Sequence, residues 1–333
     1  ETQVCAEAVA ETDKINFATF DTDVVAALDA CLGARKARIE AAVLMRGLPI
    51  NVRATDGIAV SLAAALQSHQ SPNVDGDRLI ETERPCNGSP CVAAWRNPYR
   101  SGVFFPGFED DTQGYTHRPW LVTMLNGYGF EEAAGLIASA TTAEALGGSQ
   151  ATFLFMDGAN APRQVLDNQA DRVIDRLTDL GLSGDRVPFD RNLTGRTLAG
   201  FITGSQTLGQ TIEGNTFAPG ALVDNLTSLG ARPQNFDPNR NESQVSIARW
   251  VARGVAGAHG TTAEPLNNVF PSRFFVSEYA EGATLGEAFF RNMPFLFWRN
   301  LVIGAPMAAP YAERPQVALT APPQSSGAYL FAA

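Results

Sequence analysis

Residues 151–181, ATFLFMDGANAPRQVLDNQADRVIDRLTDLG, decide the fold class. They open with a short apolar run, which is typical of a buried strand. Val173, Ile174 and Leu177 then recur at helical spacing, and Gly181 is suited to ending the helix. A buried strand that leads into an amphipathic helix is the repeating unit of a parallel α/β sheet.

The same alternation continues on both sides of this stretch. Strands are predicted in AAVLM (41–45, buried on both faces), RPWLVTMLNG (118–127), LAGFITG (198–204) and VAGAHG (255–260). Helices are predicted in FDTDVVAALDACLG (20–33), GIAVSLAAALQSH (57–69), FEEAAGLIASATTAEAL (130–146), ESQVSIARWVARG (242–254) and most of 272–293. PGALVDNLTSL (219–229) is predicted as a turn that leads into an apolar segment. We therefore predict an α/β fold with a mostly parallel sheet flanked by helices.

We expect one α/β domain over residues 1–311, because no linker or repeat divides the chain. Residues 70–118 are rich in Pro, Gly and Asn, and we interpret them as a loop-rich insertion in that domain. Residues 312–333 form an extended tail rich in Pro, Ser and Ala.

The composition of the 333 residues excludes two classes of partner. A net charge of −10 argues against nucleic acid, because binding to the phosphate backbone needs clustered Lys and Arg. No apolar run is long enough to span a bilayer, and the longest near the carboxyl end (293–307) is interrupted by Arg299 and Asn300.

The four cysteines favour disulfide bonds and an exported protein. Cys86 and Cys91 flank the short segment NGSP, so we pair them with each other, and we pair Cys5 with Cys31. The chain begins with Glu1, which is consistent with removal of a signal peptide. We therefore expect a periplasmic, cell-surface or extracellular location.

Neither a metal nor a cofactor is expected. The cysteine and histidine spacing lacks a zinc pattern. The acidic run from Glu109 to Asp111 lacks the spacing of a calcium loop, so we interpret it as solvated. No glycine-rich segment matches a phosphate-binding motif.

Four residues form the best catalytic candidate. Ser228 or Ser205 could act as a nucleophile with His259 as its base and Asp224 as the orienting acid, because their segments end on one edge of the predicted sheet. Glu264 is an alternative orienting acid. A purely structural interpretation stays open. In it the serines cap helices or form hydrogen bonds with the backbone of loops, and His259 is a structural residue.

Several blocks resemble an uncharacterised family of bacterial secreted proteins. The blocks are VLMRGLPINV, RPWLVTMLNGYGFEEAAGLI, FAPGALVDNLTSLGA, RWVARGVAGAHGTTAEP and YAEGATLGEAFFRNMPFLFWRNLVIGAPMAAPY. More distantly, they are similar to the gingipain-like cysteine peptidases, which have a caspase-type α/β fold. That resemblance implies a His-Gly after one central strand and a Cys after the next. This chain has Gly204-Ser205 and Thr227-Ser228 at those places, so it lacks the Cys/His dyad. The family also has a strand and helix upstream of the position that matches residue 1.

Two functions follow as hypotheses. The first is a non-catalytic exported protein, a pseudoenzyme on a caspase-like scaffold that acts as a binding or assembly component. It would self-associate or bind another envelope or extracellular protein. Tail 316–333 is the candidate segment for this contact, because its apolar end AYLFAA is suited to pairing with an edge strand. The second is a serine-type hydrolase that uses Ser228 or Ser205 with His259.

Overall fold

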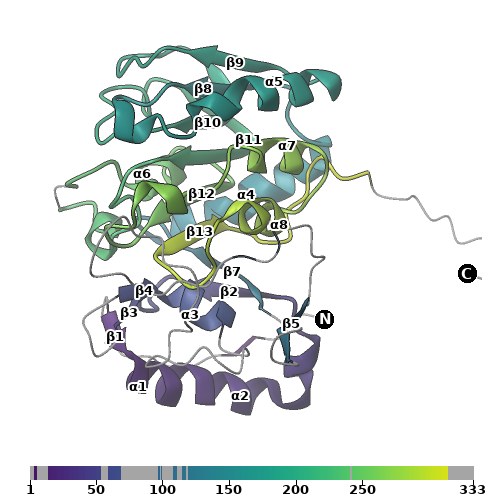
Figure 1. The fold of residues 1–333 in the computed structure, drawn as a ribbon, viewed down its shortest axis with the longest axis vertical. Helices are drawn as coiled ribbons and strands as arrows, with labels where there is room; N and C mark the ends of the chain where they lie inside the picture. The colour runs from purple at the N-terminus through teal and green to yellow at the C-terminus, as the bar shows by residue number, and fades with distance from the viewer. Residues whose placement is uncertain are drawn as a thin grey trace, which may run out of the picture.

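A computed structural model of the chain is built around an eight-stranded sheet. It describes residues 4–5, 14–53, 59–68, 97, 99, 108–110, 115–117, 119–240 and 242–313. The strand order is β2 (Ala41–Met45), β7 (Leu121–Leu125), β13 (Asn300–Gly304), β12 (Gly257–Thr261), β11 (Thr216–Asn225), β10 (Thr197–Thr203), β8 (Thr152–Met156) and β9 (Gly184–Val187). In Figure 1 these strands are stacked from β9 at the top to β2 in the lower half.

The predicted fold class is confirmed: an α/β protein with a mostly parallel sheet flanked by helices. The pairs β2–β7, β12–β11, β11–β10, β10–β8 and β8–β9 are all parallel, whereas β13 runs antiparallel to β12. The carboxyl ends of β8, β10, β11 and β12 therefore meet at one edge of the sheet, where α/β proteins commonly bind ligands.

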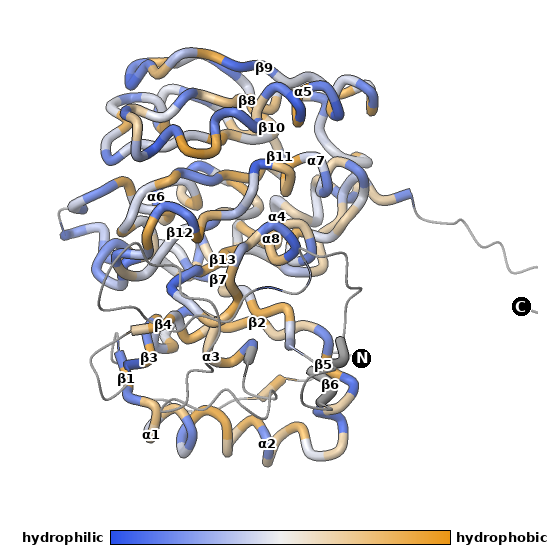
Figure 2. Tube along the Cα trace, in the orientation of Figure 1, coloured by the Kyte–Doolittle hydropathy of each residue, from blue (hydrophilic) through white to orange (hydrophobic). Residues whose placement is uncertain are grey.

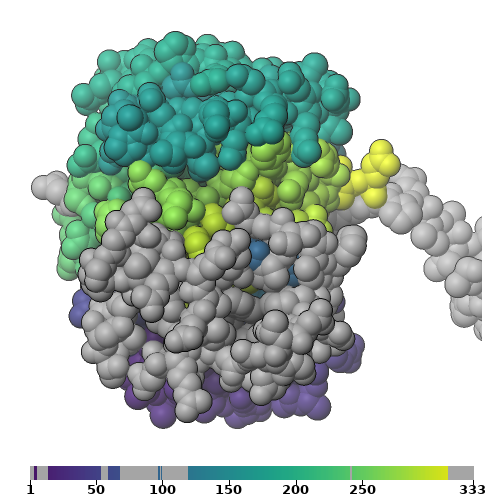
Figure 3. Space-filling view, in the orientation of Figure 1, coloured from purple at the N-terminus to yellow at the C-terminus, as the bar shows by residue number. Residues whose placement is uncertain are grey.

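The remaining elements surround this sheet. The α-helices are α1 (Phe17–Thr19), α2 (Ala26–Leu32), α3 (Leu62–Ser68), α4 (Phe130–Leu146), α5 (Ala170–Asp179), α6 (Ile247–Val251), α7 (Phe275–Ala280) and α8 (Leu285–Asn292). The short strands β1 (Lys14–Asn16), β3 (Asn51–Arg53) and β4 (Ala59–Ser61) form a small sheet, and β5 (Phe108–Asp110) pairs with β6 (Tyr115–His117). The space-filling view places the amino-terminal residues at one end of the molecule and the segment around β8 and β10 at the other (Figure 3).

Two glycines in β12 show which helix covers which face. A Cβ atom on Gly257 would lie 2.5 Å from Leu285 Cδ1 of α8, and one on Gly260 would lie 2.7 Å from Ile247 Cγ2 of α6. Side chains alternate between the faces of a strand, so α8 and α6 cover opposite faces. His259 is on the α8 face together with Gly257.

Aromatic packing anchors α6 to the sheet. The Trp250 ring is fully buried, with its centroid 5.2 Å from the ring of Phe201 and 5.6 Å from that of Phe217. Large aromatic side chains contribute strongly to core stability because each removes a large apolar area from water. This contact therefore holds the helix that precedes β12.

Three local predictions are corrected. β2 is an edge strand in the described sheet, with 41 % of Val43 and 48 % of Met45 exposed, so it is not buried on both faces. Residues 59–61 form strand β4 against β3, and the helix begins only at Leu62. The segment around Pro219 and Gly220, predicted as a turn, lies within β11.

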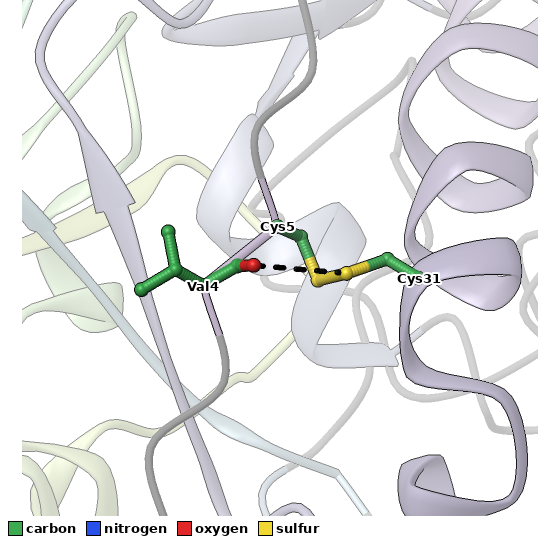
Figure 4. The surroundings of a disulfide bond; sticks show 3 residues. All are labelled: Val4, Cys5 and Cys31. Atoms are coloured by element: carbon green, nitrogen blue, oxygen red, sulfur yellow. Dashed lines mark hydrogen bonds between the residues drawn. A yellow bond between two sulfur atoms is a disulfide. The ribbon is translucent and has the colours of Figure 1, made fainter.

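The predicted Cys5–Cys31 disulfide is confirmed, and it links the amino-terminal segment to the end of α2 (Figure 4). Figure 2 shows polar and apolar residues alternating along α1 and α2, as expected for a helix that covers a core with one side. Cys86, Cys91, nearly all of the 70–118 insertion and the tail from residue 314 lie outside the described residues. In the part that the structure describes, we find no helix with the length and apolar character needed to cross a membrane.

Candidate functional site

His259 lies on β12, directly beside Asp224 of the neighbouring strand β11. The two residues are register partners, and His259 Nδ1 lies 2.7 Å from Asp224 Oδ1. Both side chains are 0 % exposed. The structure thus brings together two of the four predicted catalytic residues, in the arrangement of an orienting acid and an imidazole.

Arg273 completes a buried ion pair with Asp224. Its side chain comes from the segment just before α7, is only 2 % exposed, and donates from Nη1 to Asp224 Oδ2. Its Nη2 donates to the backbone carbonyl of Thr203 at 3.0 Å. A charge that is removed from water must be paired and hydrogen-bonded. The carboxylate of Asp224 and the guanidinium of Arg273 meet this requirement for each other.

The second ring nitrogen of His259 is also occupied. Nε2 lies 3.0 Å from Asn300 Oδ1, and the amide nitrogen of Asn300 donates to the Val269 carbonyl at 3.4 Å. Asp224 and Asn300 thus both present oxygens to the ring, so each ring nitrogen already has a hydrogen-bond partner. A ring held in this way has no nitrogen placed to take a proton from a serine.

Phenylalanine rings enclose the imidazole. The Phe270 ring stands edge-on to it at 5.5 Å between centroids, and the Phe289 ring of α8 lies at 6.3 Å. His259 is therefore sealed from solvent on the α8 face of the sheet.

The two candidate serines are bonded elsewhere. Ser228 Oγ donates to Glu264 Oε1 at 3.0 Å, and Ser205 Oγ donates to the Thr207 carbonyl at 2.7 Å. Glu264, the alternative orienting acid, is thus a partner of Ser228 and not of His259. In the structure, the ring nitrogens of His259 are bonded to neither serine.

A pocket of about 580 Å³ lies next to this buried group. Its apolar lining is Val165, Leu166, Leu266, Phe270 and Pro294, and its polar lining is Gln169, Glu264, Asn267, Asn268 and Ser272. Phe270 separates the pocket from His259, and Gln169 Oε1 accepts hydrogen bonds from Ser272 Oγ and from the backbone N–H of Arg273. The pocket thus shares its wall with the segment that positions Arg273.

Two loops form the pocket rim. The first (157–169) is held over the end of β10 by a hydrogen bond from the Ala159 N–H to the Gly204 carbonyl, 2.8 Å long. The second (262–272) is tied to the first because Asn267 Nδ2 donates to the Pro162 carbonyl at 2.6 Å. In the second loop, Leu266 has φ 75°, and no other described residue except glycine has a positive φ. A leucine in this region carries backbone strain, which is often concentrated at binding sites.

Three residues of this region were not predicted from the sequence: Arg273, Asn300 and Gln169. Gln169 and Asn300 belong to segments distant in sequence from both Asp224 and His259, and Arg273 lies beyond the loop that follows β12. One signal was available, since Arg299 and Asn300 interrupt an otherwise apolar run. A polar residue inside such a run is typical of a buried hydrogen-bonding role, but the run alone does not identify its partner.

Burial raises the pKa of Asp167 in the first loop, although the N–H of Gly158 and the charge of Arg273 both act to lower it. The ionised carboxylate therefore costs stability at neutral pH. We expect Asp167→Asn to be more stable than the wild-type chain at pH 7, because the amide oxygen still accepts from Gly158 and carries no charge. The folded pKa lies above the unfolded one, so this cost disappears as pH falls below both values.

Urea unfolding of the two chains at pH 7 and pH 3 measures this difference. The same substitution at the exposed Asp175 on α5 controls for the general effect of removing one negative charge. If Asp167→Asn changes the free energy of unfolding by the same amount at pH 7 and at pH 3, the ionised Asp167 carboxylate is not the cause of the destabilisation.

Among the described residues, no group of three or more His, Cys, Asp or Glu side chains is arranged to hold a metal ion. The structure does not describe the side chains of the acidic run at residues 109–111 or of His117.

Comparisons with known proteins give only a weak structural likeness. No family model matches the chain, and no curated protein matches it. Among solved structures, the chain is similar to one in the Saccharomyces cerevisiae separase–securin complex, with a TM-score of 0.33 and 9 % sequence identity. The match covers 58 % of this chain and 16 % of that one.

Proposed function

We propose that this chain is a non-catalytic exported protein that acts as a binding or assembly component on a caspase-like α/β scaffold. The observation that carries the proposal is the bonding of His259, whose two nitrogens face Asp224 and Asn300 in a fully buried position. A general base must have a free lone pair within reach of the proton that it takes. His259 instead lies on β12 and connects it to both neighbouring strands, through Asp224 of β11 and through Asn300 at the start of β13.

The pocket supports a binding role. Its volume of about 580 Å³ is within the range of small-molecule sites, and it combines apolar walls with a few polar groups. The Cys5–Cys31 disulfide supports export, because disulfides persist in oxidising compartments. Self-association or binding to an envelope or extracellular protein belongs to the same proposal, with tail 316–333 as the candidate segment from the sequence.

The second candidate is a serine-type hydrolase, and one observation favours it. The 2.7 Å contact between Asp224 and His259 at the carboxyl end of parallel strands is the acid–base half of a catalytic triad. Ser228 or Ser205 would supply the nucleophile. Its hydroxyl would have to leave its present partner, and Asn300 would have to release His259 Nε2.

A fluorophosphonate probe separates the two candidates, because it labels serines that are activated by a neighbouring base. We expect no labelling of the wild-type chain, and no difference in ester or peptide hydrolysis between the wild-type chain and Ser228→Ala or Ser205→Ala. We expect His259→Gln to lower the free energy of unfolding by about 1–3 kcal/mol in urea, because buried hydrogen bonds are lost. Labelling that disappears in Ser228→Ala and in His259→Gln would support the hydrolase and overturn the proposal.

A further inference from the structure

The pocket beside the buried Asp224 group has a single ionisable residue in its lining. Of the ten described residues that line its volume of about 580 Å³, Glu264 alone is ionisable, and no Lys, Arg or His is among them. The carboxylate repels an anionic ligand and attracts a cationic one. The charge of the lining therefore favours a cation.

Glu264 is held in place through both its backbone and its side chain. Its backbone carbonyl accepts a hydrogen bond from Arg299 Nη1, and the carbonyl of Pro265 accepts one from Trp298 Nε1 at 2.9 Å. Its Oε1 accepts from Ser228 Oγ at 3.0 Å. Its Oε2 has no hydrogen bond to a described residue. The structure thus presents a fixed carboxylate with one oxygen available to a ligand.

Arg299 lies close to Glu264 without occupying that oxygen. Its Nη1 donates to the Glu264 backbone carbonyl, and its Nε donates to the Ala59 carbonyl at 3.1 Å. The carbon at the centre of its guanidinium lies 4.7 Å from the centroid of the Trp298 ring. The guanidinium is therefore bound to backbone carbonyls and to an aromatic face, and Glu264 Oε2 remains available.

Apolar side chains form much of the remaining wall. Leu166 and Phe270 belong to a small apolar cluster of the core, whereas 47 % of Val165 and 39 % of Leu266 are exposed. A ligand that covers Val165 and Leu266 with an apolar group removes apolar surface from water, which is favourable. Leu266 also has the positive φ described above, so the backbone of this wall carries strain.

We propose that the pocket binds a small organic ammonium ion, with its nitrogen at Glu264 Oε2 and its apolar body against Val165 and Leu266. A hydrogen bond from an ammonium to a carboxylate is charge-assisted and gives the contact its direction. The volume fits a ligand of small-molecule size. Two sources carry this chemistry: a free amine, and a lysine side chain beside an aromatic residue of a peptide. The inference names the ligand class of the proposed binding role and rests on the proposed function in that respect.

Three probes with one apolar body test the choice of charge. Phenylbutylamine is a cation, phenylbutanol is neutral and phenylbutyrate is an anion. By isothermal titration calorimetry, we expect the full wild-type chain to bind the amine at least about threefold more tightly than the alcohol, and to bind the acid most weakly. Equal affinities for the amine and the alcohol, or no binding of the amine, would overturn the proposal.

Two substitutions test the position of the site. Glu264→Gln keeps the shape of the side chain and removes its charge, so we expect the preference for the amine over the alcohol to disappear while the alcohol binds as before. Unchanged binding of the alcohol also shows that this variant is folded. Glu131→Gln is the matched control, because Glu131 is exposed on α4 and outside the lining. Val165→Trp should weaken both probes, since it narrows the pocket. A Glu264→Gln chain that still prefers the amine would place the site elsewhere and contradict the inference.

A peptide distinguishes the two sources of the ammonium. The acetylated dipeptide amide Phe-Lys is compared with phenylbutylamine, and its neutral analogue with norleucine in place of lysine is the control. Tighter binding of the dipeptide than of phenylbutylamine identifies a peptide ligand, and weaker binding identifies a free amine. Both results support the proposal if Glu264→Gln removes the preference for the charged probe, and both oppose it otherwise.

Failure of this inference is distinguishable from failure of the proposed function. A chain that binds no amine would lose its ligand class, and the fluorophosphonate result would be unchanged. Labelling by the fluorophosphonate that depends on Ser228 and His259 would overturn the non-catalytic role, and the affinities for the amine and the alcohol would still be measured independently.

Discussion

Arg273→Met is expected to lower the free energy of unfolding by about 3–5 kcal/mol, the usual cost of removing one partner from a buried ion pair. The Asp224 carboxylate is 0 % exposed and would keep only His259 as its partner. The carbonyl of Thr203 would lose one of its two donors and keep the N–H of Leu226. Urea unfolding monitored by circular dichroism measures the change.

Two controls identify the cause of this loss. Arg196→Met removes a surface ion pair with Asp185, whose side chains are 38 % and 43 % exposed, so we expect a change of about 0–1 kcal/mol. The double variant Arg273→Met with Asp224→Asn should lose less than the sum of the single variants, because no unpaired charge remains. Equal losses for Arg273→Met and Arg196→Met would refute the role of the buried pair.

Trp250→Ala is expected to cost about 3–5 kcal/mol, because it leaves a cavity between α6 and the sheet. The indole ring packs against Phe201 and Phe217 and is fully buried. Its Nε1 has no hydrogen-bond partner among the described residues, so Trp250→Phe keeps most of the packing and loses no polar contact there. We expect that variant to lose only about 1 kcal/mol in the same urea assay. Similar losses for both variants would point to a role of the indole other than packing.

The sequence predicted the centre of the sheet well because its strands alternate with helices. β8, β10 and β12 were identified from short apolar runs, and the helix after each of β7 and β8 from its spacing. The first half of β11 was missed because Pro219 and Gly220 suggest a turn. Pairing with β10 on one side and β12 on the other overrides that local preference, and the register between β10 and β11 shifts there.

The edge of the sheet could not be predicted in the same way. The apolar run of β2 predicts a strand, but the run does not reveal how many neighbours the strand has. Val43 and Met45 share one face of β2 and are partly exposed, whereas Leu44 on the other face is buried. Exposure of this kind is a property of the tertiary arrangement and has no local pattern.

The site was half predictable. Asp224 and His259 were selected because their segments were predicted to end at one edge of the sheet, and the structure joins them directly. Arg273 and Asn300 complete the hydrogen bonding of that pair, and the sequence did not single out either of them. Their role depends on long-range contacts, which a single sequence does not specify.

The buried group around Asp224 also has a consequence for the order of folding events. Its members come from β10, β11, β12, the start of α7 and the start of β13, so its contacts join distant parts of the chain. Loop closure over such separations is costly, and we expect these contacts to form only after the strands have paired. Interactions that form after the transition state slow unfolding and leave the folding rate nearly unchanged. The group would then extend the lifetime of the native state and so delay cleavage of the unfolded chain by proteases.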